Sequence, residues 1–203
     1  MIRRAVALAL WLAAGPAPAQ DLPAVYDVAG VAAGDVLNVR AEPSAGAPVL
    51  RTLAPDAKGI EVVALSGDGK WGMVSTGEGN GWVALRYLAA RPDPAANTLP
   101  RPMTCLGTEP FWLLAHDSGS DSFETPGEEP QLLSVSAEMV APEGYFVLAR
   151  GSGGDDLYQL TITRGTCSDG MSDRRFGLDA RLFIASPDGN RLFRGCCTLE
   201  HRD

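Results

Sequence analysis

Leu37-Asn38-Val39-Arg40-Ala41-Glu42-Pro43-Ser44 and Gly81-Trp82-Val83-Ala84-Leu85-Arg86-Tyr87-Leu88 are the stretches that decide the fold of the first half of the chain. Apolar and polar residues alternate in the first stretch, as in a half-buried strand. Pro43 ends it, because proline fixes φ and has no amide to donate. Short runs of this kind, broken by Gly, Pro or Asp every eight to twelve residues, predict a small antiparallel barrel or sandwich.

The residues between these two stretches continue the pattern. Ile60, Val62 and Ala64 fall on one face of a further strand. About seventy residues build only a thin core, so each large side chain counts heavily in it. We therefore expect Trp71 and Trp82 to be buried and to supply much of that core.

The two stretches, with Trp71 between them, resemble the bacterial SH3-like (SH3b) family over about residues 25–90. The resemblance implies a domain at 22–90 that binds cell-wall peptides or docks onto a neighbouring domain. From the residues themselves, Asn38, Arg40 and Tyr87 are the candidates for a partly exposed ligand groove. The alternative for these three side chains is that they simply close the barrel.

Residues 91–102 contain Pro92, Pro94, Pro100 and Pro102 among small and polar residues, without apolar periodicity. Proline-rich polar segments form semi-extended linkers. This segment separates a half without cysteine from a half that contains four. We interpret it as a linker between two domains.

Residues 103–200 repeat the alternating pattern with longer strands. Tyr158, Leu160 and Ile162 lie on one face of such a strand, and 178–185 alternates in the same way. Six or more strands with tight turns predict a second antiparallel barrel or sandwich. The predicted fold class is therefore all-β, with two small domains joined by the proline-rich linker.

Three segments of the second half, Cys105–Trp112, Cys167–Asp173 and Leu192–Cys197, resemble a family of uncharacterised exported bacterial proteins. Their signatures are Gly-Thr-Glu-Pro-Phe-Trp and Cys-Ser-Asp-Gly-Met-Ser-Asp. The resemblance supports the domain boundary and implies no activity. We interpret Trp112 as core, Glu109 as structural and the Asp-Gly segment as a loop braced by its cysteine. A carboxylate pair facing one cleft is the open alternative.

Cys105, Cys167, Cys196 and Cys197 are the four cysteines of the chain. An even number in an exported protein predicts disulfides. Spacing alone does not determine their connectivity. If antiparallel strands join Cys105 to Cys197, then Cys167 pairs with Cys196; a bridge between the adjacent cysteines would need a strained peptide.

The first residues have the features of a secretory signal peptide. Arg3 and Arg4 precede an apolar run at 5–14, and Ala17-Pro18-Ala19 matches the small-x-small cleavage pattern. We expect a signal peptide at 1–19 and a mature periplasmic protein that starts at Gln20. The apolar run is about half of what a membrane span requires, and no cysteine precedes Cys105 to accept a lipid.

The chain is acidic, with 25 acidic and 17 basic residues and a net charge of −8. Removing the two arginines of the signal peptide leaves 15 basic residues and makes the charge about −10. Such a surface repels phosphate backbones and anionic headgroups. We expect no nucleic-acid partner and no membrane span after signal cleavage.

A thiol enzyme is not expected from these residues. A cysteine nucleophile requires a base, which is nearly always histidine. The chain has only His116 and His201, and Cys105 does not lie in the Asp-Cys-Ser-Gly setting of cell-wall peptidases. We therefore favour disulfide-paired cysteines over a catalytic thiol.

No metal and no cofactor are expected either. Zinc sites use short fixed spacings such as Cys-x-x-Cys, which are absent, and adjacent strand residues such as Cys196 and Cys197 point to opposite faces. Asp155-Asp156, Asp169 and Asp173 are the nearest approach to a calcium site. We favour turns in which these aspartates cap their own backbone.

The sequence thus predicts a non-catalytic envelope protein without cofactor. Its expected partner is a peptidoglycan stem peptide or an envelope protein, bound through the first domain. The alternative is a periplasmic inhibitor or sensor whose second domain acts on a cell-wall lytic enzyme.

Overall fold

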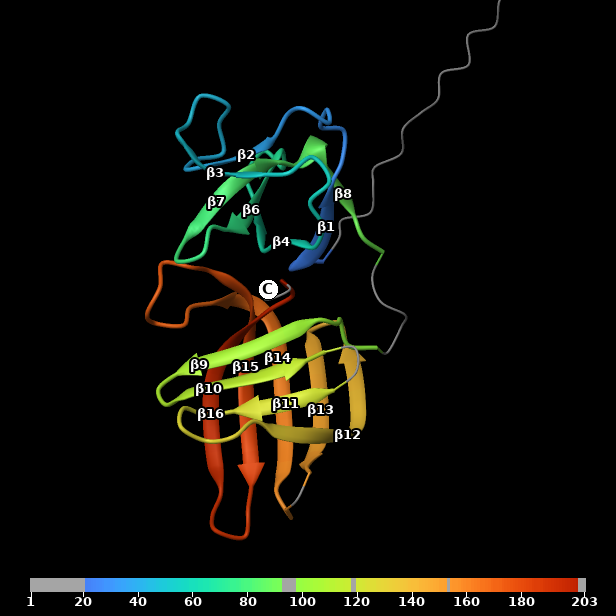
Figure 1. Ribbon diagram of the computed structural model, residues 1–203, viewed down its shortest axis with the longest axis vertical. Coiled ribbons are helices and arrows are strands. Elements are labelled where there is room, and N and C mark those ends of the chain that lie inside the picture. Colours follow the sequence, from blue (N-terminus) through green and yellow to red (C-terminus); the bar gives the residue numbers. More distant parts are fainter. Residues whose placement is uncertain (1–20, 93–97, 118–119, 153, 201–203) are drawn as a thin grey trace, which may run out of the picture.

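The computed structural model describes residues 21–92, 98–117, 120–152 and 154–200. In this part the chain is all-β and antiparallel, with two domains stacked end to end (Figure 1). The predicted fold class is confirmed. The predicted signal peptide at 1–19 and residues 93–97 of the predicted linker lie outside the described residues.

The N-terminal domain contains two sheets, with strand orders β4-β1-β8 and β3-β2-β7-β6-β5. Its elements are β1 (Ala24–Val28), β2 (Leu37–Arg40), β3 (Val49–Leu53), β4 (Ile60–Val62), β5 (Ala64–Leu65), β6 (Trp71–Ser75), β7 (Asn80–Ala84), the 3-10 turn η1 (Leu85–Tyr87) and β8 (Leu88–Ala90). Its buried core consists of Val28, Leu37, Val39, Leu53, Ile60, Val62, Val74 and Val83.

Trp71 and Trp82 are not part of that core, so the expectation that they fill it is wrong. Both are only half-buried. The inward positions beside them are glycines: a Cβ at Gly72 would lie 2.9 Å from the Val62 side chain, and one at Gly81 would lie 2.5 Å from that of Val39. Because side chains alternate between the two faces of a strand, glycine inside places each tryptophan outside.

The C-terminal domain is a closed eight-stranded barrel in which each strand pairs with the next in sequence and β16 returns to β9. Its strands are β9 (Met103–Thr108), β10 (Phe111–His116), β11 (Asp121–Glu124), β12 (Gln131–Ala141), β13 (Gly144–Gly151), β14 (Leu157–Cys167), β15 (Phe176–Ala185) and β16 (Arg191–Thr198). Large buried side chains from all eight strands fill its interior, among them Trp112, Phe123, Tyr158 and Phe193. The interior is a packed core, as in other small barrels.

Residues of the predicted linker belong to this barrel. Leu99 is 1% exposed and packs into the barrel core. Two residues on, Arg101 donates to Asp121 Oδ1 at 2.7 Å and to Glu138. Strand β11 pairs with β12 only over Gln131–Leu133, so Arg101 joins the two strands where their ladder has ended.

The two domains meet at a buried carboxylate. Glu61 of β4 is 1% exposed and accepts hydrogen bonds from the Thr198 hydroxyl at 2.6 Å and the Leu199 amide at 3.0 Å. Arg174 donates to the same hydroxyl at 2.9 Å and to Glu200 at 2.9 Å. Each of these partners of Glu61 belongs to the barrel domain.

Further contacts surround this joint. Gly177 lies so close to Pro23 that a Cβ would be 2.8 Å from the proline ring. Val25 packs against the barrel core, and Asn80 Nδ2 donates to the Asp173 carbonyl at 3.2 Å. The loop that precedes β15 therefore lies against the beginning of β7 (Figure 1).

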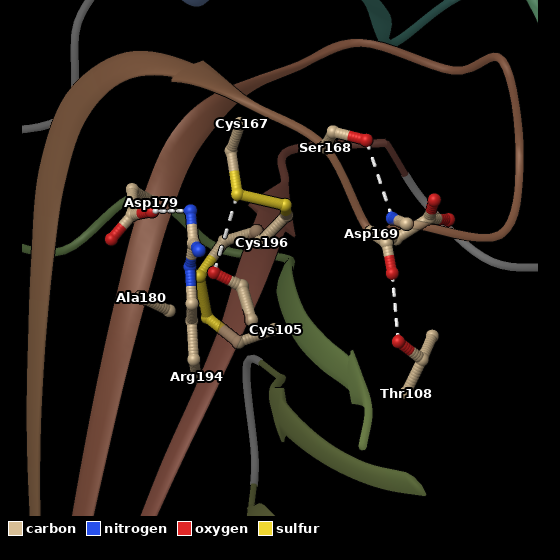
Figure 2. The surroundings of a disulfide bond; sticks show 12 residues. Cys105, Thr108, Cys167, Ser168, Asp169, Asp179, Ala180, Arg194 and Cys196 are labelled. Carbon is tan, nitrogen blue, oxygen red and sulfur yellow. Dashed lines mark hydrogen bonds and ion pairs between the residues drawn. A yellow bond between two sulfur atoms is a disulfide. The ribbon is translucent and has the colours of Figure 1, made fainter. Parts of the chain in front are cut away.

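The two disulfides join Cys105 to Cys197 and Cys167 to Cys196, which confirms the predicted pairing (Figure 2). Cys105 and Cys197 are directly opposite in the β9–β16 ladder. Structural disulfides indicate an oxidising, extracytoplasmic location. No helix in the described part of the chain is long and apolar enough to cross a membrane.

Alkylation of the unreduced protein should label no cysteine, because all four sulfurs are bonded. Full reduction should lower the free energy of unfolding by about 2–4 kcal/mol for each bridge, through the entropy gained by the unfolded chain. Mass spectrometry and thermal unfolding with and without reductant measure the two effects. Labelling of any cysteine before reduction would contradict the pairing.

Leu99→Ala should lower the free energy of unfolding by about 2–5 kcal/mol, because it leaves a cavity in the barrel core. Thr98→Ala, one residue earlier and exposed, is the matched control and should change it by less than about 0.5 kcal/mol. Denaturant unfolding of both variants makes the comparison. Equal stability of the two variants would show that the linker is not part of the barrel fold.

Candidate functional site

The outer face of the five-stranded sheet carries a row of large side chains centred on Trp82. Trp82 of β7 is opposite Arg40 of β2 on one side and Met73 of β6 on the other. Trp71 lies two residues before Met73 on the same face, and all four side chains are half-buried. They form what we call the Trp82 face.

The polar groups of the Trp82 face are fixed in part by the sheet itself. Arg40 Nη1 donates to the Ala47 carbonyl at 2.7 Å, which anchors the guanidinium to the loop between β2 and β3 and leaves further N–H groups for a ligand. Asn38 also points outward from β2. Its side-chain amide makes no hydrogen bond within the described residues. Aromatic faces beside a guanidinium suit a ligand with apolar surface and a carboxylate.

Tyr87, the third residue predicted for the groove, is not brought to this face. It lies in η1 and packs against the domain core. Its carbonyl accepts a hydrogen bond from Ala29 at 2.9 Å, and Arg86 covers its ring at 4.7 Å. A ligand role for Asn38, Arg40 or Tyr87 stays a prediction, but only the first two share a surface.

From the sequence, a core position is favoured for Trp71 and Trp82 over a ligand-binding one, and Met73 is not singled out. The signal was present in the alternation, because Gly72 and Gly81 occupy the positions that would otherwise point a side chain into the core. A glycine between large apolar residues in a strand indicates close packing on its own side. The large neighbours must then face outward.

A second candidate is a cleft on the barrel, formed where the two sequence signatures of the second half meet. The turn between β9 and β10 lies against the loop between β14 and β15, and Thr108 Oγ1 donates to the Asp169 carbonyl at 2.7 Å (Figure 2). The cleft has a volume of about 500 Å³. It is lined by Gly107, Thr108, Glu109, Phe111, Ser168, Asp169, Gly170, Met171, Arg194 and Gly195.

Asp169 shapes one wall of this cleft by capping its own turn. Its Oδ1 accepts from the amides of Met171 and Ser172 at 3.0 Å each, and its Oδ2 accepts from the Ser172 hydroxyl at 2.9 Å. Burial opposes the charge, but these donors outweigh it and hold the pKa of Asp169 below its usual value. A carboxylate held ionised in this way serves as a turn cap and not as a proton donor near neutral pH.

The floor of the cleft rests on a buried indole. Trp112 is 3% exposed, and its Nε1 donates to the Arg194 carbonyl at 3.1 Å. The rim is apolar and open, since Phe111 is 52% exposed and Met171 is 67% exposed. Glu109 is exposed beside them. The cleft therefore offers a rigid backbone floor between two exposed hydrophobic side chains.

A histidine–aspartate pair lies inside the barrel near the domain joint. His116 Nδ1 and Asp121 Oδ2 are 2.6 Å apart, and both side chains are buried. Burial raises the pKa of Asp121, but His116 and Arg101 outweigh it and keep that pKa below its usual value. All four sulfurs of the chain are bridged, so no cysteine serves this pair as a nucleophile.

No protein-family model matches this chain, and no curated protein or solved structure is significantly similar to it. Among the described residues, no group of three or more His, Cys, Asp or Glu side chains is arranged to hold a metal ion.

Gly107→Ala should destabilise the barrel and distort the cleft. Its Cβ would lie 2.1 Å from Trp112 Nε1 and 2.4 Å from the Arg194 carbonyl oxygen, and overpacking of this kind costs about 1–3 kcal/mol or more. Gly165→Ala is the matched control, because a Cβ there meets nothing within 4 Å. Thermal unfolding of both variants, with tryptophan fluorescence for Trp112, measures the difference; equal melting temperatures would contradict the packing.

Proposed function

We propose that this chain is a non-catalytic protein of the bacterial periplasm that binds a peptide ligand on the Trp82 face. The observation that carries the proposal is the position of Trp71, Met73 and Trp82 on the outside of a sheet whose core is complete without them. Exposing two indoles to water is unfavourable unless a partner covers them. Arg40 beside them supplies a fixed cation for a carboxylate.

The ligand class that fits best is the stem peptide of peptidoglycan. Stem peptides are short and carry several carboxylates, which a half-buried guanidinium recognises well. The resemblance to the SH3-like family and the predicted signal peptide point to the same ligand and the same compartment. A small face of this kind supports weak binding, with a free energy of about −8 kcal/mol at micromolar affinity.

Trp82→Ala should weaken binding of the mature protein to purified sacculi at least tenfold, because truncation removes the central aromatic of the face. The loss of stability should be smaller than for a core residue such as Val83, since Trp82 points outward. Leu65→Ala removes an exposed side chain on β5 and is the control for lost apolar surface. Sedimentation with sacculi at low salt, together with thermal unfolding, measures both quantities.

Two outcomes would contradict the proposal. One is a wild-type protein that does not sediment with sacculi at low salt. The other is a Trp82→Ala variant that binds as well as the Leu65→Ala control. An envelope protein would then be the more suitable partner for this domain.

A second candidate function is favoured by the barrel cleft, where Phe111 and Met171 are exposed on either side of a rigid floor. In this function the barrel is the domain that binds a cell-wall lytic enzyme, and the protein acts as an inhibitor or sensor of that enzyme. Paired substitution of Phe111 and Met171 by alanine should then abolish capture of such an enzyme and leave sacculus binding unchanged. Trp82→Ala should weaken sacculus binding and leave capture of the enzyme unchanged.

A further inference from the structure

Glu61 is a carboxylate buried in the joint between the two domains. It is buried only because both domains contribute to its surroundings. Its strand neighbours Ile60 and Val62 belong to the core of the N-terminal domain. Glu61 is 1% exposed, and its hydrogen-bond donors are the Thr198 hydroxyl and the Leu199 amide of the barrel. Separation of the domains would return this side chain to water.

The charge of Glu61 is poorly compensated in the docked state. Arg174 Nη2 lies 3.8 Å from Glu61 Oε2, but it donates at 2.9 Å to Glu200, a second carboxylate facing the same joint. Strand β1, the partner of β4, places the apolar Val25 opposite Glu61. Burying an ion costs several kcal/mol unless a well-placed opposite charge offsets it.

We propose that Glu61 is a proton-operated lock between the two domains: its protonated form holds them together, and its ionisation loosens the joint. In the locked form the neutral carboxyl group stays buried, with the Thr198 hydroxyl donating to Oε2 and the Leu199 amide donating to Oε1. On ionisation the proton passes to solvent and leaves a buried charge. Undocking then hydrates that charge.

The pH dependence follows from the difference between the docked and separated states. Burial is the main reason why the pKa of Glu61 is raised from 4.5 to about 7 in the docked protein; Glu200 adds to this, while Thr198, Leu199 and Arg174 oppose it. Because the docked pKa is the higher one, docking is fully supported below 4.5 and loses this support as the pH rises through about 7. Between pH 5 and pH 8 the docking constant should fall on the order of tenfold to a hundredfold.

The lock controls how the two candidate surfaces are placed. Asn80, on the same strand as Trp82, touches Asp173 of the loop that also lines the barrel cleft. A closed joint therefore holds the Trp82 face and the cleft in one orientation, and an open joint frees them. This inference depends on neither proposed ligand.

Amide hydrogen exchange of Leu199 tests the lock, because its N–H donates to Glu61. We would compare the full mature chain with its Glu61→Gln variant, in which a neutral amide of the same shape replaces the protonated acid. Comparing both at the same pH cancels the intrinsic exchange rate. The ratio of Leu199 protection in the variant to that in the wild type should rise at least tenfold between pH 5 and pH 8.

Asp68→Asn is the matched control, because it removes an exposed carboxylate from a turn of the same domain. It should keep the pH dependence of the wild type. A Glu61→Gln ratio that does not change with pH would overturn the proposal. So would a Glu61 titration midpoint near 4.5 in carboxyl-carbon NMR of the wild type, a measurement that needs no variant.

Discussion

The structure depends on the seam where β16 closes the barrel against β9. Only three residue pairs form this ladder, from Cys196 opposite Leu106 to Thr198 opposite Thr104. The Cys105–Cys197 disulfide bridges the middle pair, so this ladder, which is as short as the one between β11 and β12, is closed covalently. A closed barrel leaves no free sheet edge only while such a seam holds.

The domain joint and the barrel cleft both adjoin this seam. One residue beyond the disulfide, Thr198 makes the contact with Glu61 that joins the domains. On its other side, Gly107 and Gly195 let the two strands approach the indole of Trp112 and so form the floor of the cleft. A single ladder therefore positions both the domain joint and the cleft.

The adjacent cysteines Cys196 and Cys197 belong to two different clusters of buried residues, one on each face of β16. Cys197 faces inward and is part of the barrel core, whereas Cys196 belongs to a separate cluster with Cys167 and Phe176. Since successive strand residues point to opposite faces, one dipeptide can anchor the interior and the outer loop together. The pairing was predicted on another ground: antiparallel strands could join Cys105 to Cys197, and a bridge between the adjacent cysteines would need a strained peptide.

Local patterns predicted the fold class, the strands and the disulfides, because each depends on residues that are neighbours in sequence or in a ladder. The burial of Trp71 and Trp82 was predicted wrongly, since hydrophobicity indicates the core while the glycines beside them occupy the inward positions. Leu99 was missed because it lies in a proline-rich segment that resembles a linker. Glu61 could not be found at all: in Ile60-Glu61-Val62 the alternation correctly turns it away from its own core, and only domain docking buries it.

The loop from Cys167 to Arg174 transmits the constraint of the seam to the N-terminal domain. Its start is fixed by the disulfide to Cys196, its middle by the Thr108 hydroxyl, and its end by Arg174 at the joint. A neutral hydrogen bond contributes only about 1 kcal/mol, so the disulfide is the main restraint on the position of the loop. The contacts of Arg174 hold the other end of the loop at the joint. Because this loop lines the cleft at one end and contacts Asn80 at the other, it connects the joint to the cleft.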